Sequence, residues 1–177
     1  MMKGFPILVA FICLPFFMMA QTGYKQAIGI RLNTHTTYDV IAASYKNFPS
    51  EKSALEFNLG FGGRNIYVPN QAPKTSFSPA VSLSGSFQHH ELIETPTNDD
   101  FRWFAGGGIT VLGAKSKNNG YEGFGTAIFG TCGLDYVFKN SPINVTADWR
   151  PQVYIASPSA YMPLHIGTLG LAVRYIF

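Results

Sequence analysis

Histidines are the first residues of this chain that could bind a metal ion or carry acid–base chemistry. His89 and His90 are adjacent in a segment whose side chains alternate in polarity, so they point to opposite faces of a strand. Two histidines on opposite faces do not hold one ion, and no nearby Cys, His or Asp completes the spacing of a zinc site. The sequence therefore predicts no metal site and no cofactor.

A serine activated by a histidine is the second chemistry to consider. Ser157 and Ser159 precede His165 in the sequence, and Asp39 could supply the carboxylate of such a set. Ile166 and Gly167 follow His165, so no His-x-Ser pattern is present. Histidines in loops are common, and we expect no catalytic residue and no enzyme.

Charged side chains form the third group, because many of them share the polar face of alternating segments. A charge that is buried in a narrow interior must be paired. We expect Lys46 to lie opposite Glu56, and Asp148, Arg150 and Arg174 to form a second group. Together they would fill the interior; the alternative is an ion path. The predicted inward charges are Lys25, Arg31, Lys46, Glu56, Arg102, Asp135, Asp148, Arg150 and Arg174.

The elements that position these charges are strands, because the apolar residues recur with a period of two. In one segment Leu55, Phe57 and Leu59 alternate with Glu56 and Asn58. No convincing helical period is found in the chain after residue 20. Eight such segments are predicted: 26–32, 38–48, 55–62, 81–88, 101–115, 127–138, 143–153 and 169–177.

The two faces of these strands favour a membrane barrel over a soluble β-sandwich. The polar face carries mostly Gly, Ser, Ala and Thr, as suits a narrow barrel interior, whereas a sandwich would show Lys and Glu to water. The apolar face is rich in Leu, Phe, Tyr and Trp, as suits lipid. We predict an all-β, eight-stranded, antiparallel, up-and-down transmembrane β-barrel. Its expected aromatic girdle is Phe48, Phe101, Trp103, Phe138, Tyr175 and Phe177.

Composition and the N-terminal segment indicate the cellular compartment in which the protein is expected. Residues 1–20 have a short positive start and an apolar stretch that ends at Ala20, which predicts a cleaved signal peptide followed by one barrel domain over 21–177. Charged residues make up 13% of the chain, against about 25% in soluble domains. The net charge of +3 has no basic cluster, so we expect no nucleic-acid partner.

The connections divide into two sets, one at each end of the predicted barrel. We expect the inner, periplasmic connections to be 49–53, 91–100 and 140–142. The outer loops are then 33–37, 65–76, 116–124 and 156–163. Recognition, if there is any, would lie in the outer loops, since a filled barrel has no internal pocket. The aromatic and basic residues of that surface are Tyr67, Tyr121, Phe124, Tyr161, Lys74, Lys115 and Lys117; they could equally be anchors at the lipid boundary.

The architecture, with a last strand that alternates from Leu169 to Tyr175 and stops at Phe177, resembles the small eight-stranded outer-membrane barrels of the OmpA and OmpX type. The resemblance implies a porin-like barrel that is located in the outer membrane of a Gram-negative cell envelope. It also implies contact with outer-membrane lipid and lipopolysaccharide, and insertion by the barrel-assembly machinery through the strand that ends in Phe177. We expect a monomer.

The function that these features favour is a non-catalytic integral barrel with a structural, adhesive or surface-interaction role. Its lumen is expected to be filled and not to form a large pore. Two alternatives stay open: an outer-membrane enzyme that modifies lipid A, and the passage of small molecules or ions through a narrow barrel. A soluble, lipocalin-like carrier is disfavoured by the outward apolar face.

Overall fold

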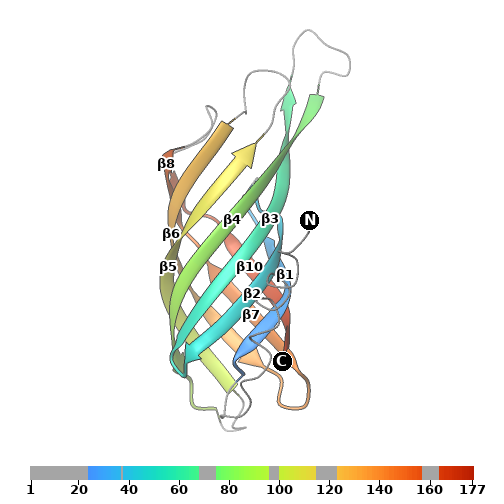
Figure 1. Ribbon diagram of the computed structural model, residues 1–177. Helices are drawn as coiled ribbons and strands as arrows, with labels where there is room; N and C mark the ends of the chain where they lie inside the picture. The colour runs from blue at the N-terminus through green and yellow to red at the C-terminus, as the bar shows by residue number, and fades with distance from the viewer. Residues whose placement is uncertain (1–23, 37, 68–74, 96–99, 115–122, 157–163) are drawn as a thin grey trace, which may run out of the picture.

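A computed structural model describes residues 24–36, 38–67, 75–95, 100–114, 123–156 and 164–177. These residues form a tall barrel whose strands are tilted relative to the barrel axis (Figure 1). Its strands are β1 (Gln26–Asn33), β2 (Ile41–Ser50), β3 (Ser53–Tyr67), β4 (Thr75–Leu92), β5 (Asp100–Ala114), β6 (Gly123–Val137), β7 (Ile143–Trp149), β8 (Gln152–Ala156), β9 (Leu164–His165) and β10 (Leu169–Ile176). No helix among the described residues is long and apolar enough to cross a membrane.

The sheet closes on itself, and neighbouring strands are antiparallel. The strand order is β5-β4-β3-β2-β1-β10-β7-β6-β8-β9, and a further pairing of β5 with β6 joins its two sides. β7 and β8 both pair with β6 and form one wall, while β9 and β10 form the next. The eight-stranded, antiparallel, up-and-down barrel is therefore confirmed. Since β1 pairs with β10, closure joins the two ends of the barrel chain.

Two of the walls are interrupted, one between β7 and β8 and one between β9 and β10. The sequence pattern predicts a single strand over the segment 143–153, so it does not predict the break between β7 and β8. Proline has no N–H to donate, so a strand ladder is broken at Pro151. The neighbours still bond around the break: the Gly130 N–H donates to the Pro151 carbonyl at 3.0 Å, and the Arg150 N–H donates to the Thr168 carbonyl at 2.9 Å. The barrel thus stays closed where β7 passes into β8.

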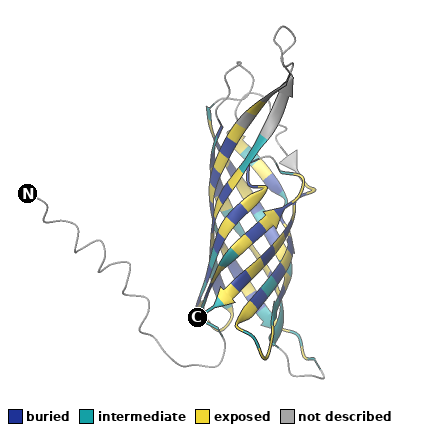
Figure 2. Cartoon of the chain, turned by 90° about the vertical axis from the view of Figure 1, so that its right-hand side faces the viewer, coloured by how far each residue is buried: buried dark blue, intermediate teal, exposed yellow. Residues whose placement is uncertain are grey.

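The predicted alternation of side chains is confirmed along the walls. Figure 2 shows exposed and buried positions alternating along the strands. On β1, Ile28 and Ile30 are more than half exposed, whereas Ala27 and Arg31 are fully buried. On β3, Phe57 and Leu59 are exposed and Glu56 and Asn58 are buried. The barrel therefore has an apolar outside and a polar inside.

Several strands are longer than predicted at the end of the barrel where β3 meets β4. β3 continues to Tyr67, β4 begins at Thr75, and β6 begins at Gly123, so the ends of the expected loops 65–76 and 116–124 are strand. The outer parts of these strands are mostly small or polar, and such residues give no alternation of hydropathy to detect. We call this end the loop end; the turn end carries the connections β2–β3, β4–β5 and β6–β7.

Two predicted placements are wrong. β2 begins at Ile41 and not at Tyr38, and Tyr38 lies in the preceding connection with its side chain buried. Phe48 was expected in an outer aromatic girdle, but it is 8% exposed and its ring contacts Tyr24 and His90. Phe48 has the same parity as Ser44 and Lys46 on β2, so it must face inward with them.

Candidate functional site in the barrel interior

Glu56 is the centre of the polar interior. The alternation of β3 points its carboxylate inward, and side chains from five other walls reach it, including Gln88 of β4, which donates to it at 3.1 Å. Its oxygens lie 3.2 Å from Arg31 Nη1, 3.0 Å from Arg174 Nη2 and 3.3 Å from Arg150 Nη2. Lys46 Nζ is further away, at 3.9 Å. One carboxylate therefore joins β1, β2, β4, β10 and the junction between β7 and β8 across the lumen.

A second carboxylate, Asp135 of β6, collects donors nearer the turn end. Lys46 Nζ and Asn144 Nδ2 both donate to it at 2.7 Å, and the Tyr24 hydroxyl donates at 3.1 Å. Burial, together with the negative charge of Asp135, raises the pKa of Tyr24 well above its usual value. The Tyr24 hydroxyl therefore stays protonated and can donate to Asp135. Because Tyr24 precedes β1, this bond fastens the segment before β1 to β6.

The third carboxylate, Asp148, accepts a 2.6 Å bond from Arg31 Nη2. The interior ion pairs thus join four cations, Arg31, Lys46, Arg150 and Arg174, to the three carboxylates Glu56, Asp135 and Asp148. All seven side chains are at most 2% exposed. Burying unpaired charge costs several kcal/mol per ion, about 3–5 when one partner is removed, so each member depends on the others.

Aromatic rings cover the ionic cluster on the side of the turn end. His90 stacks on Phe104 with ring centroids 4.9 Å apart, and Phe48 meets the edge of His90 at 4.8 Å. Lys46 Nζ lies 4.8 Å from the centre of the Phe104 ring, a cation–π contact. His90 Nε2 is hydrogen-bonded to Gln88 Oε1 at 3.1 Å. This layer separates the buried charges from the turn end.

At the loop end, the connection between β1 and β2 folds into the barrel. Tyr38 is 2% exposed and packs with Ala80, Leu112 and Ala114 of β4 and β5. Asp39 is also buried and lies against Gly60, where a Cβ atom would come within 2.4 Å of the Asp39 Cβ. This outer loop was predicted at 33–37; in the structure β1 ends at Asn33 and β2 begins at Ile41, and Tyr38 and Asp39 of the connection are buried.

The inward charges that the sequence singled out are largely brought together. Those of the ionic cluster are buried as predicted, while Lys25 and Arg102 are only partly buried. Arg102 forms its ion pair with Asp100 at the rim, 2.5 Å away. The pairing of Lys46 with Glu56 in register is confirmed. The predicted separate group of Asp148, Arg150 and Arg174 is wrong, because both arginines form ion pairs with Glu56 and Asp148 forms its ion pair with Arg31.

Of the residues considered for chemistry, the structure describes the side chains of His89, His90 and Asp39. His89 is exposed and His90 is buried, so they face opposite sides as predicted. Asp39 lies inside the barrel mouth, where Thr36 Oγ1 donates to its carboxylate at 2.5 Å. Ser157, Ser159 and the side chain of His165 lie outside the described residues.

The predicted recognition surface falls mostly outside the described part of the chain. Phe124 is exposed as expected, at 85%, and stands at the start of β6. Tyr67 belongs to β3. Tyr121, Tyr161, Lys74, Lys115 and Lys117 lie outside the described residues.

Three inward aromatic residues were missed by the analysis of polar and apolar faces. Phe104 and Phe129 are buried in the lumen, and Arg150 lies over the Phe129 ring at 4.5 Å from its centre. Their positions in the alternation could have predicted this: Phe104 is two residues from Arg102, and Phe129 is two residues from Thr131, so each lies on the same inward face as its neighbour. Tyr38, the third, has no such signal, because it lies in a connection.

The interior arrangement can hold the walls together and occupy the cross-section with paired charge. Both are mechanical roles, and neither requires a bound ligand. No family model matches this chain, and no curated protein and no solved structure matches it either.

Proposed function

We propose that this protein is an integral barrel of the bacterial outer membrane, without catalytic activity, which serves a structural, adhesive or surface-interaction role. The observation that carries the proposal is the inversion of polarity across the wall. Large apolar side chains are exposed on the outside of all eight walls, while Arg, Lys, Glu and Asp are buried inside.

The exposed apolar side chains of the eight walls together form a band around the barrel, which we call the apolar belt. A belt of this extent favours contact with lipid over contact with water. The largest apolar patch of a typical soluble monomer covers about 300–600 Å² and occupies one side of the molecule. Here the exposed residues recur on every strand, for example Ile30 on β1, Leu83 on β4 and Val173 on β10. A closed barrel also satisfies its backbone hydrogen bonds between strands, which the interior of a bilayer requires.

The polar interior argues against a soluble carrier of apolar ligands. A carrier of the lipocalin type keeps a ligand cavity within its barrel. Here the centre of the lumen is occupied by the cluster around Glu56, which leaves no apolar cavity there among the described side chains. The same packing supports a closed lumen rather than a large pore.

The orientation that we propose for the barrel in the membrane follows from the difference between its two ends. The short connections of the turn end would face the periplasm and the long β3–β4 hairpin would face outward, as in barrels of this class. Partners are then outer-membrane lipid and lipopolysaccharide, together with the machinery that assembles such barrels. We propose a monomer.

Membrane fractionation of cells that express the full chain tests the proposal. We expect the protein in the outer-membrane fraction, released by detergent and not by alkaline carbonate. We also expect the detergent-solubilised barrel to change its electrophoretic mobility when boiled. Recovery as a monodisperse protein in buffer without detergent would contradict the membrane location.

Planar-bilayer recordings test the closed lumen separately. The purified barrel should insert without stable, large single-channel currents, because paired side chains occupy its cross-section. Large and stable conductance would contradict the closed lumen and favour the passage of solutes. The surface role is tested by replacing residues 68–74, 115–122 and 157–163 with short Gly/Ser turns; assembly should persist while adhesion or surface binding is lost.

A further inference from the structure

We propose that a notch on the outside of the barrel, at the loop end of β4, β5 and β6, holds one acyl chain of an outer-leaflet lipid. The inference rests on the proposed function, because it requires the apolar belt to face a bilayer. It goes further by naming one place on the belt where a lipid is held in a preferred position.

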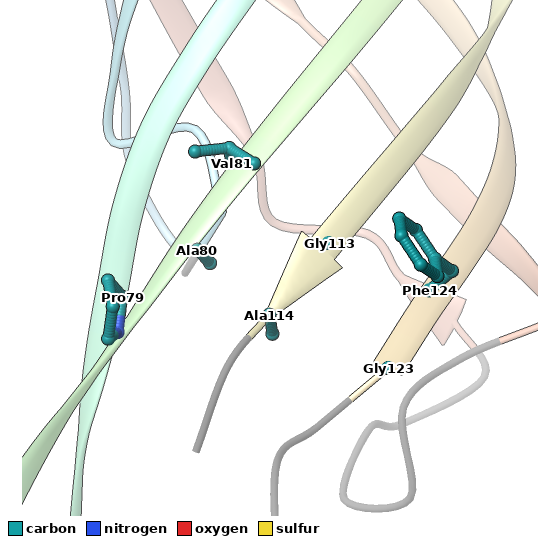
Figure 3. A pocket seen from close by; sticks show the side chains of 7 residues that line it. All are labelled: Pro79, Ala80, Val81, Gly113, Ala114, Gly123 and Phe124. Carbon is teal, nitrogen blue, oxygen red and sulfur yellow. The ribbon is translucent and has the colours of Figure 1, made fainter. Parts of the chain in front are cut away.

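The notch arises because a glycine, which has no side chain, lies between two residues with large side chains. Val81, Gly113 and Phe124 lie in register on β4, β5 and β6 and point outward. Val81 is 49% exposed and Phe124 is 85% exposed, while Gly113 presents bare backbone between them. Figure 3 shows Val81 and Phe124 on either side of Gly113. The cavity has a volume of about 460 Å³, and Pro79, Ala80, Ala114 and Gly123 also border it; the side chains of Ala80 and Ala114 are buried and face the barrel interior.

The floor of the notch is open, unlike the surroundings of Gly108 on the same strand. A Cβ atom on Gly113 would meet Phe124 Cε1 at 3.6 Å and Val81 Cγ2 at 3.9 Å, both ordinary contact distances. A Cβ atom on Gly108, on the same strand, would instead lie 2.2 Å from the Gly85 carbonyl oxygen. Gly108 is thus needed for packing between strands, whereas Gly113 leaves free volume on the outer surface.

The lining selects an apolar occupant. None of the seven residues has a polar atom in its side chain, and Gly113 and Ala114 are paired with both neighbouring strands. A polar or charged ligand would therefore lose its hydration without gaining partners. Hydrocarbon would instead gain dispersion contacts with the Phe124 ring and the Val81 methyl groups.

The position of the notch identifies the apolar occupant as lipid. Leu83 and Val111, in the next outward row, are 60% and 48% exposed, so the notch is continuous with the belt. A belt that encircles the barrel is covered by a surrounding fluid phase rather than by one partner. Trp103, near the turn end of β5, and Gly113 are ten residues apart on the strand. A membrane strand takes about 9–11 residues, so the notch lies at the outer-leaflet boundary.

Photo-crosslinking in vesicles tests the inference. The full-length barrel is reconstituted with a phospholipid that carries a diazirine on its acyl chain near the glycerol, and labelled residues are mapped by mass spectrometry. We expect severalfold more label on Val81 and Phe124 than on Leu32 and Ile155, which are exposed near the same end on other walls.

Gly113→Phe should abolish this excess by filling the notch, and Phe124→Ala should lower it by removing one wall. Gly130→Phe is the matched control, since Gly130 also lies on the outer surface and its Cβ would meet only Pro151 Cγ, at 3.7 Å. It should leave the excess unchanged. The folding of each variant is checked by the mobility shift on boiling.

The outcomes separate the two proposals. Equal labelling around the belt would overturn the notch as a lipid site while supporting the membrane location. An absence of label from the whole belt would overturn the membrane location itself. Loss of label from Phe124 as the protein-to-lipid ratio is raised, with the label on Leu32 and Ile155 unchanged, would show that a second copy fills the notch, and would likewise overturn the inference.

Discussion

Lys46 and Glu56 face each other in register on β2 and β3, yet the shorter ion pair of Lys46 is made with Asp135, on the other side of the lumen. Its Nζ atom lies 2.7 Å from Asp135 Oδ2 and 3.9 Å from Glu56 Oε2. Because the Glu56 oxygens are engaged by arginines of other walls, Lys46 completes the network by reaching β6. The network therefore runs across the barrel and not only along neighbouring strands.

Removing the charge of Glu56 should destabilise the barrel strongly. Glu56→Gln leaves four cations with two carboxylates in a buried space, and breaking a buried pair costs about 3–5 kcal/mol. We expect a loss of that size in the free energy of unfolding, measured by urea titration in lipid vesicles. Glu91→Gln is the control, since its pair with Lys52 is exposed. Equal stability of both variants would show that the Glu56 network does not hold the walls together.

Gly29 should be required for closure of the barrel. A Cβ atom at this position would lie 2.0 Å from the Val173 carbonyl oxygen of β10, so β1 and β10 would have to move apart. Gly29→Ala should cost about 1–3 kcal/mol or more, as overpacking does. Gly85→Ala, whose Cβ would meet the Phe57 ring at 3.5 Å, should cost much less. The yield of the compact form on unboiled gels measures closure, and a normal yield for Gly29→Ala would contradict the prediction.

The buried loop at the mouth should contribute to stability through Tyr38. Truncating a buried aromatic side chain to alanine typically costs about 3–5 kcal/mol, because contacts are lost and a cavity remains. Tyr38→Ala should therefore lower the thermal unfolding temperature clearly. Val40→Ala, at an exposed position of the same loop, should change it little. If the two variants unfold at the same temperature, the loop does not plug the mouth in solution.

Leu59 and Leu92 test the lipid-facing surface at two depths. Leu59 is exposed midway along β3, and Leu92 is exposed at the turn end of β4. An arginine on the lipid face costs about 2–4 kcal/mol at the bilayer midplane and about 0–1 near the interface. Leu59→Arg should thus impair assembly into vesicles far more than Leu92→Arg. Equal tolerance of the two changes would mean that the belt does not face lipid.

The inside and outside of the barrel could be predicted from the sequence because strand geometry is strictly alternating. A period of two places Glu56 and Leu59 on opposite faces whatever the rest of the fold does. The same rule puts Arg31, Arg150 and Arg174 inside, as the structure confirms. Even the register of Lys46 with Glu56 follows from a short connection between two consecutive strands.

Only the tertiary structure decided which inward side chains meet. Arg174 reaches Glu56, and Lys46 reaches Asp135, because closure brings strands distant in the sequence within a side chain's length across the lumen. Tyr38 is buried because the β1–β2 connection folds into the mouth, where β4 and β5 provide its contacts. Alternation along a strand specifies a face; the partner on that face depends on curvature, register and loop path, which are properties of the closed barrel as a whole.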